Sequence, residues 1–290
     1  RYAAFKPPSS PSFPHSSRAI AFPTDVTDSD AVQRLAEAAV GISGRVDTWI
    51  NVAGTGVFGP YENASAALHR TTIEVNLIGA MNGASAALPI FKRQCSGVLI
   101  STVSMGGWSP VPFAAAYTAS KFGLRGFNAS LRQQFTASED IHICGVFPAM
   151  VDTPGLEHVA NVSGKVIDPG PFLYTPEDVA AAMLRVARRP QAEVGIGWPA
   201  RASQVAYALS PRITELIVGA IFRKLVTSAG VAAKTEGALL SPLAAGRSAS
   251  GGYLERKGLP SAGAISSTGL LLAGLGLAIG SAVLVRRQKR

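Results

Sequence analysis

The sequence predicts an α/β fold in which helices cover both faces of a parallel β-sheet. Short apolar runs alternate along the chain with segments of helical periodicity. These runs are nearly continuous, as expected for strands that are buried on both faces. Hydrophobic residues make up 47% of the 290 residues and charged residues only 16%, which excludes a highly charged, disordered chain.

The elements follow in a regular order. An apolar run at residues 19–23 is the first strand, and a helix is expected at 30–40, closed by Gly41 and Gly44. Thr175 and Pro176 begin a later helix that extends to about residue 189, because Thr caps a helix and Pro suits its first turn. The other elements are a strand at 46–52, a helix at 65–91, a strand at 98–101, a helix at 115–135, and strands at 141–147 and 194–198.

The two ends of the chain differ in composition. Residues 1–18 are rich in Pro and Ser and are expected to form a disordered arm. Residues 264–285 carry no charge, and a helix of that length spans about 33 Å, enough for the core of a bilayer. A basic tail follows at 286–290. We therefore predict a transmembrane helix, with a buried core helix as the alternative. Residues 201–226 are expected to be an amphipathic helical extension, and 227–263 a loosely structured linker.

The charge and cysteine content exclude several function classes. The net charge is +9, but Arg286, Arg287, Lys289 and Arg290 are clustered in the tail, and no basic run with interleaved aromatic residues indicates nucleic-acid binding. Two cysteines do not form a disulfide scaffold or a four-ligand zinc site. The histidines have no metal-ligand spacing, so no metal site is expected.

Four polar residues form a candidate catalytic group. Tyr117 and Lys121 are four residues apart, which places them on one helix face, and an adjacent ammonium lowers the pKa of a phenol. Ser104 follows the strand at 98–101, and ligands of such sheets bind at the carboxyl ends of strands. Asn76 lies among apolar residues of a helix, which indicates a buried role.

With these residues, the chain resembles the short-chain dehydrogenase/reductase family. The matching motifs occur in the family's order over residues 19–200, about two-thirds of the chain. They are Asp25-Val26-Thr27 after a strand, Asn51-Val52-Ala53-Gly54, the Val75-to-Gly79 helix motif, a Ser 13 residues before Tyr117, Tyr117-Thr118-Ala119-Ser120-Lys121, and Pro148-Ala149-Met150-Val151-Asp152-Thr153.

The resemblance implies a doubly wound Rossmann fold and an NAD(P)-dependent exchange between an alcohol and a carbonyl. NAD or NADP is the implied cofactor. Tyr117 is implied as the acid or base, Lys121 as its modulator and ribose ligand, Ser104 as the group that orients the substrate oxygen, and Asn76 as the holder of a relay water. The implied cofactor-binding residues are Asp25, Val26, Asn51, Ala53, Gly54, Tyr117, Lys121, Pro148, Val151 and Thr153.

The sequence departs from the family at its beginning. The glycine-rich phosphate turn is missing, because the first glycine is Gly41. The fold is therefore expected to lack its first βαβ portion, which leaves the apolar strand at 46–52 at an open edge. Two interpretations follow: an N-terminally incomplete version of an active enzyme, or a catalytically inactive, membrane-anchored binding protein on a degenerate domain.

The expected C-terminal anchor and the implied use of nicotinamide nucleotides together predict where the protein is located. We expect a single-pass C-terminal membrane anchor with the catalytic domain in the cytosol, where nicotinamide nucleotides are available. The expected substrate is a small alcohol or carbonyl compound of lipophilic character, and a homodimer is a further expectation.

Overall fold

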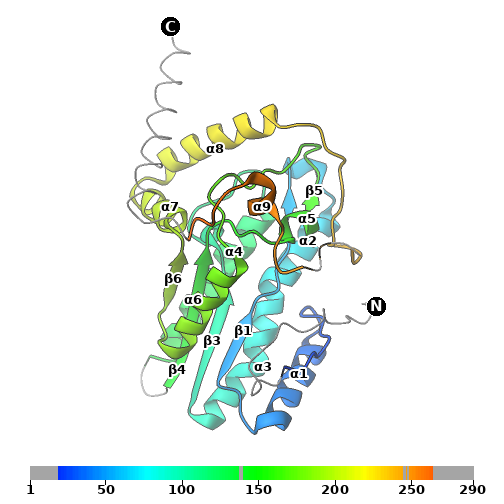
Figure 1. Cartoon of the computed structure of the whole chain (residues 1–290). Coiled ribbons are helices and arrows are strands. Elements are labelled where there is room, and N and C mark those ends of the chain that lie inside the picture. The colour runs from blue at the N-terminus through cyan, green and yellow to red at the C-terminus, as the bar shows by residue number, and fades with distance from the viewer. Residues whose placement is uncertain (1–18, 137–139, 244–245, 247, 264–290) are drawn as a thin grey trace.

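A four-stranded parallel sheet forms the centre of the protein (Figure 1). The computed structural model describes residues 19–136, 140–243, 246 and 248–263, so the predicted arm at 1–18, the apolar segment at 264–285 and the tail at 286–290 lie outside the described residues. The strand order is β1-β3-β4-β6, and all three pairings are parallel. The strands are β1 (Thr48–Asn51), β3 (Ser96–Thr102), β4 (Asp140–Pro148) and β6 (Glu193–Ile196).

Helices cover both faces of this sheet, as the sequence predicted. Leu99 of β3 and Ile143 of β4 pack against helices on one face, namely α1 (Ser29–Ser43), α3 (Gly79–Gln94) and α4 (Ala115–Gln134). Their neighbours Ile100 and Val146 pack on the opposite face against α6 (Pro176–Arg188). Successive side chains of a strand point to opposite faces, so both faces of β3 and β4 must be apolar.

Local sequence signals set the ends of the helices. Asp28 caps α1 by accepting hydrogen bonds from the backbone of Asp30 and Ala31, and Gly44 ends α1 in the left-handed conformation. Thr175 and Asp178 form a reciprocal capping box at the start of α6. These contacts satisfy backbone groups that a helix end otherwise leaves without partners.

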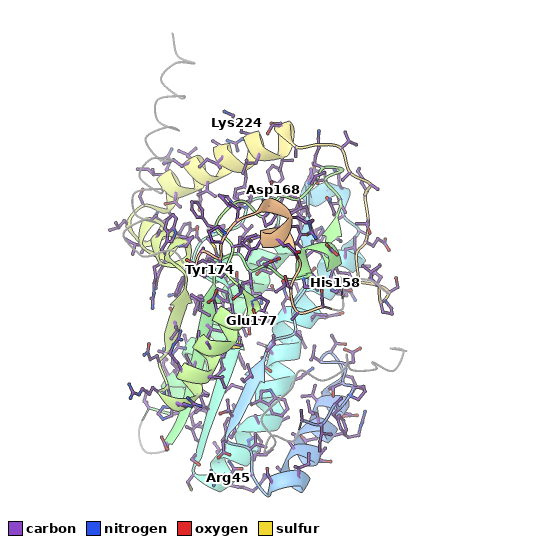
Figure 2. All side chains as sticks on the ribbon, in the orientation of Figure 1. Arg45, His158, Asp168, Tyr174, Glu177 and Lys224 are labelled. Carbon is purple, nitrogen blue, oxygen red and sulfur yellow. The ribbon has the colours of Figure 1, made fainter. Side chains whose placement is uncertain are left out.

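The remaining elements lie mostly at the carboxyl end of the sheet. In Figure 2, Arg45 marks the amino end of the sheet, and Tyr174 and Lys224 lie toward the other end. The smaller elements are β2 (Val57–Phe58) paired with β5 (Ala160–Asn161), η1 (Tyr61–Asn63), α2 (Ala66–Ile73), η2 (Glu74–Ile78), η3 (Met105–Gly107), α5 (Gly155–His158), α7 (Trp198–Leu209), α8 (Pro211–Ser228) and α9 (Tyr253–Lys257).

Three segments differ from expectation. Residues 19–23 form no strand, and within the described part of the chain β1 lies at an edge of the sheet with Ile50 and Val52 exposed. The helix expected at 65–91 contains a π-helical turn, η2, between α2 and α3. Parts of the segment 227–263, expected to be a loose linker, pack on the domain: among its described residues, Val231 and Thr235 form β-bridges, and Ala262 is buried.

The core makes a direct stability prediction. Leu99 is fully buried at the centre of β3, so Leu99→Ala is expected to lower the free energy of unfolding by about 2–5 kcal/mol. Leu184 of α6 is 56% exposed, and Leu184→Ala is expected to change it by less than about 0.5 kcal/mol. Denaturant titration of both variants provides the measurement, and equal losses would contradict this assignment of the core.

Candidate active site

The loops that follow the strands meet at one edge of the sheet. Asn51 at the end of β1 is in register with Ser101, and Thr102 of β3 is in register with Val146 of β4. The segments after these strands carry most of the site residues expected from the sequence. Because all strands run in one direction, their carboxyl ends form a common rim, where ligands of open α/β sheets bind.

Ser104 is held in a strained backbone conformation just after β3. Its φ of 111° lies in a region that residues with a side chain rarely adopt. Its hydroxyl accepts a hydrogen bond from the backbone of Gly106, 3.2 Å away. Strain of this kind persists only when the surroundings enforce it, and it is concentrated at functional sites. The conformation therefore supports a functional role for Ser104.

The phenol of Tyr117 is hydrogen-bonded to the side chain of Ser104. Burial raises the pKa of Tyr117, and the Ser104 hydrogen bond opposes that increase only in part. The direction is opposite to the lowering expected from the Tyr-Lys spacing. Desolvation of the phenolate is the larger effect, so the hydroxyl of Tyr117 carries its proton at neutral pH.

Lys121 lies beneath Tyr117 on the same face of α4. Its side chain is only 4% exposed, its Nζ donates a hydrogen bond to the carbonyl oxygen of Thr102 at 2.9 Å, and the same atom lies 5.5 Å from the centre of the Tyr117 ring. Burial lowers the pKa of Lys121 to about 8, because an ammonium is poorly solvated there. The ammonium and its neutral form are thus both accessible near physiological pH.

Asn76 connects the turn after β1 to helix α4. It lies in the π-helical turn η2, where its Oδ1 accepts from the backbone of Thr55 at 2.7 Å. Its Nδ2 donates to the carbonyl of Thr55 and to the hydroxyl of Ser120, both at 2.9 Å. The side chain is thus used for positioning, and a relay water at Asn76 stays a prediction. Ser120 was missed by the sequence argument, although it lies within the Tyr117–Lys121 motif.

The turn after β1 leaves space beside these groups. Val52, Ala53 and Gly54 are exposed. A Cβ placed on Gly54 would lie 3.6 Å from Oδ1 of Asn76 and 3.7 Å from Nζ of Lys121. The structure therefore brings Gly54 together with the predicted catalytic residues, and glycine keeps the approach to Lys121 open.

The residues expected to contact the adenosine lie nearby, at the start of α3. Asn51 donates from Nδ2 to the carbonyl of Ala80 at 3.2 Å. The carbonyl of Val26 accepts from Nδ2 of Asn82 at 2.9 Å. Asp25 accepts hydrogen bonds from the backbone and hydroxyl of Thr27, which shapes the loop. These residues form a second group, separate from the contacts of Tyr117.

The loop after β4 is fixed by neighbours on β6 and in the loop before α6. Pro148 ends β4, and the backbone of Ala149 donates to Ile196 of β6 at 2.9 Å. Val151 forms a parallel bridge with Tyr174. Thr153 turns back through a hydrogen bond from its backbone N–H to the carbonyl of Val151. Asp152 is buried, and its carboxylate contacts residues 250–254.

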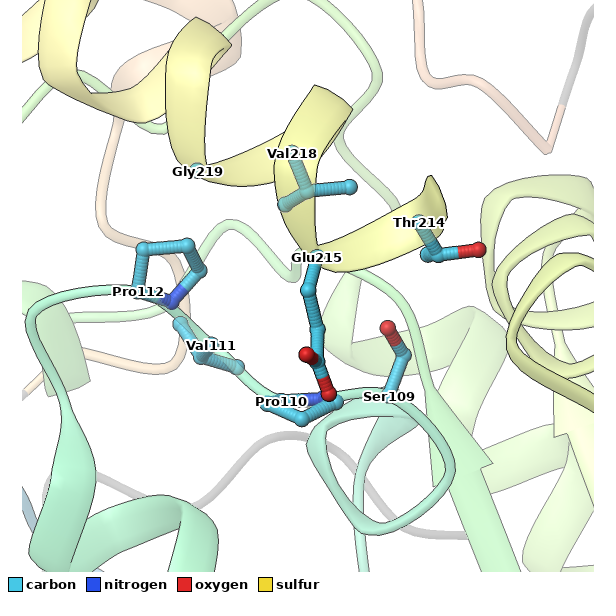
Figure 3. A pocket seen from close by; sticks show the side chains of 8 residues that line it. All are labelled: Ser109, Pro110, Val111, Pro112, Thr214, Glu215, Val218 and Gly219. Atoms are coloured by element: carbon cyan, nitrogen blue, oxygen red, sulfur yellow. The ribbon is translucent and has the colours of Figure 1, made fainter. Parts of the chain in front are cut away.

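A small cavity lies between the loop after Ser104 and helix α8 (Figure 3). Its volume is about 230 Å³. Val111, which lines it, is held next to Tyr117 by hydrogen bonds between its backbone and the hydroxyl of Thr118. Trp108 stacks on Phe147 in the core at 3.9 Å. The lining residues are Ser109, Pro110, Val111, Pro112, Thr214, Glu215, Val218 and Gly219.

Fold and site together define a class: an α/β protein in which a serine, a tyrosine and a lysine lie together at the carboxyl rim of a parallel sheet. The chain belongs to the short chain dehydrogenase family, whose model matches residues 12–162, about half of the chain. This confirms the resemblance read from the motifs. The N-terminal incompleteness inferred from the missing glycine-rich turn stays a prediction.

Relatives of this family are similar over part of their length. The chain is 30% identical to the uncharacterized oxidoreductase YxnA of Bacillus subtilis, covering 67% of this chain and 55% of the relative. It is 30% identical to the ketoacyl reductase HetN of a Nostoc species, covering 61% and 60%. The chain thus spans somewhat more than half the length of these curated relatives.

A solved structure shows the same fold. An alcohol dehydrogenase from Thermococcus sibiricus, complexed with 5-hydroxy-NADP, aligns with a TM-score of 0.51 and 23% identity. The alignment covers 59% of this chain and 71% of that one.

The end of the chain matches a second model, which corrects the predicted location. The model for the LPXTG cell wall anchor motif matches residues 255–290. Within the matched range, Leu259-Pro260-Ser261-Ala262-Gly263 has the Leu, Pro and Gly of that pattern, directly before the apolar segment. The prediction of a single-pass membrane protein with a cytosolic domain was therefore wrong. The match indicates attachment to the cell wall, and this pentapeptide was the overlooked signal.

The described residues offer no support for a membrane span. None of the helices built from them is both long and apolar enough to cross a bilayer. The segment at 264–285, on which the prediction rested, lies outside the described residues.

Proposed function

We propose that the protein is an NAD(P)-dependent oxidoreductase that interconverts an alcohol and a carbonyl compound, with Tyr117 as the acid or base. One observation carries the proposal: the phenol of Tyr117 is hydrogen-bonded to Ser104 and lies over the buried ammonium of Lys121. A strained serine, a buried tyrosine hydroxyl and a buried lysine each cost folding free energy. Packing of the core alone therefore does not explain why the three lie together.

The residues present fit a dinucleotide at the rim. Among the described residues, Nζ of Lys121 donates one hydrogen bond, so its other N–H groups are available on the side where Gly54 leaves space. We infer that Lys121 and Tyr117 hold the ribose next to the nicotinamide. We assign the remaining contacts to Asp25, Val26, Asn51, Ala53, Gly54, Pro148, Val151 and Thr153.

The protein's own groups perform the proton transfer. A nicotinamide nucleotide held by these residues would supply or accept the hydride. Ser104 orients the substrate oxygen by a hydrogen bond, and Tyr117 donates its proton to that oxygen during reduction or accepts it during oxidation. Lys121 stabilises the resulting phenolate by its positive charge. Asn76 and Ser120 keep α4 and the turn after β1 in place during these steps.

The substrate is proposed to be a small lipophilic alcohol or carbonyl compound. The cavity beside Val111 has Pro110, Pro112 and Val218 in its wall, which favours an apolar group. The carboxylate of Glu215 at its margin accepts a hydrogen bond from the hydroxyl of Tyr207 at 2.9 Å and disfavours anionic substrates. The relative HetN is a ketoacyl reductase by its name, which is consistent with a carbonyl substrate.

Nucleotide titration tests the proposal. The full chain is expected to bind NADH or NADPH saturably, followed by fluorescence, and to oxidise the bound nucleotide when lipophilic aldehydes and ketones are added. The alternative, a binding protein without catalysis, predicts no nucleotide binding at all. Binding without turnover over a broad substrate panel would leave the cofactor assignment standing and contradict the proposed reaction.

A further inference from the structure

Residues 248–263, which we call the strap, are fastened to the domain by two carboxylates, the buried one of Asp152 and the half-buried one of Asp178. The strap contains the short helix α9 and ends with the pentapeptide Leu259-Pro260-Ser261-Ala262-Gly263. In Figure 1, α9 lies over the carboxyl end of the sheet, close to the loops that follow the strands. The anchor-type pentapeptide is therefore part of the folded domain.

Asp152 fastens the first half of the strap. Its side chain is only 3% exposed, and its carboxylate accepts hydrogen bonds from the backbone of Tyr253 at 2.9 Å, the backbone of Leu254 at 3.3 Å and the hydroxyl of Ser250 at 3.2 Å. Its carbonyl also accepts from the backbone of Gly251. Without these donors, the buried carboxylate of Asp152 would have a large desolvation penalty. The hydrogen bonds therefore stabilise both the buried carboxylate and the position of the strap.

Asp178 fastens the pentapeptide itself. Its Oδ2 accepts from the hydroxyl of Ser261 at 3.0 Å, in addition to the capping bond from Thr175. A Cβ placed on Gly263 would lie only 2.8 Å from the same oxygen, so any larger residue would have to displace the Asp178 carboxylate. The C-terminal end of the pentapeptide thus fits closely against the start of α6.

Ala262 is the buried residue of the pentapeptide. It is 2% exposed and belongs to the core cluster that contains Phe147, Tyr174 and Ala200. Its backbone N–H donates to the carbonyl of Leu173 at 2.8 Å. An enzyme that recognises this pentapeptide must contact its backbone and side chains, and here those of Ala262 are already in use.

We propose that the domain masks the pentapeptide, so that an enzyme joining the protein to the cell wall through it reaches the pentapeptide only after the strap leaves the domain. Masking follows from the fold and does not depend on catalysis or nucleotide binding. The strap has two states, bound to the domain and released from it. The rate of its release sets the rate at which the pentapeptide becomes accessible.

Hydrogen exchange measured by mass spectrometry tests the masking. In the full chain, the amide of Ala262 is expected to exchange at least about tenfold more slowly than in a synthetic peptide of residues 255–263. Gly263→Ala forces a methyl group against Asp178 and is expected to remove most of that protection. Ser261→Ala removes one hydrogen bond and is expected to have a smaller effect.

Gly41→Ala provides the matched control, because a Cβ on Gly41 meets nothing within 4 Å. Protection of β3 reports whether each variant keeps its fold. In parallel, proteinase K should cut between residues 258 and 263 faster in Gly263→Ala than in Gly41→Ala. Equal exchange of Ala262 in the full chain and in the peptide would overturn the proposal. So would unchanged exchange and cleavage in a folded Gly263→Ala variant.

Discussion

Replacing Tyr117 with Phe is expected to lower kcat by about 10²–10⁴-fold and to weaken nucleotide binding much less, because Lys121 still holds the ribose. The substitution removes one oxygen atom from a buried ring, and that oxygen is the group hydrogen-bonded to Ser104. Loss of a positioned acid or base typically reduces the rate by this factor. Initial rates of nucleotide oxidation with a lipophilic ketone, together with nucleotide titration, provide the measurement.

Tyr61→Phe is the matched control for this experiment. Tyr61 is exposed and stacks on His69, away from the carboxyl rim residues described above. The control is expected to keep the activity of the unmodified chain. A Tyr117→Phe variant with nearly full activity would exclude Tyr117 as the acid or base, and unequal thermal stability of the two variants would reveal a folding defect.

Replacing Lys121 with Met is expected to lower turnover and to change how the free energy of unfolding depends on pH. Turnover should fall by about 10²-fold, because the charge that stabilises the phenolate of Tyr117 is lost. The pKa of Lys121 is about 8 in the folded protein, against 10.5 in the unfolded chain. Below pH 8 both states carry the proton, and the folded state bears the full penalty of a buried ammonium.

The sign of the pH effect follows from proton binding. Between pH 8 and 10.5 the unfolded chain binds more protons than the folded protein at this site, so the contribution of Lys121 to the free energy of unfolding rises with pH. A shift of this size corresponds to about 3 kcal/mol. We therefore expect the unmodified protein to gain stability relative to Lys121→Met between pH 7 and pH 10.

Denaturant titrations of both proteins at several pH values test this expectation. Effects of other titrating groups are common to the two chains and cancel in the comparison. Parallel stability profiles from pH 7 to pH 10 would show that the ammonium of Lys121 is well solvated, which would contradict the burial described here. An active Lys121→Met variant would separately contradict its role beside Tyr117.

Elements with strong local signals were predicted well from the sequence. The capping residues Thr175 and Pro176 placed the start of α6, and β-branched runs placed β3 and β4. The candidate catalytic group was proposed because Tyr117 and Lys121 lie on one turn of a helix and Ser104 follows a strand, and its catalytic role stays a prediction. In each case the information is contained in a few neighbouring residues.

Features that depend on distant contacts were not predicted. The π-helical turn η2 holds Asn76, whose side chain bonds Thr55 and Ser120 on other segments, and no local sequence signal shows these contacts. The pKa of Tyr117 was expected to be lowered, because the spacing shows the charge of Lys121 but not the burial of both groups. The composition of residues 227–263 indicated a linker, whereas Asp152 and Asp178 hold its end on the domain.

The burial of Ala262 also has a consequence for the order in which the protein is made. The core cluster around Trp108 and Phe147 receives a member from near the end of the chain. The ribosome adds Ala262 only after every strand of the described sheet has been synthesised. Until then, the apolar surface of Tyr174 and Ala200 stays exposed in the nascent chain. Such transiently exposed surfaces attract chaperones and promote misassembly. The core of the domain is therefore completed only when the strap, which contains the anchor-type pentapeptide, has been synthesised.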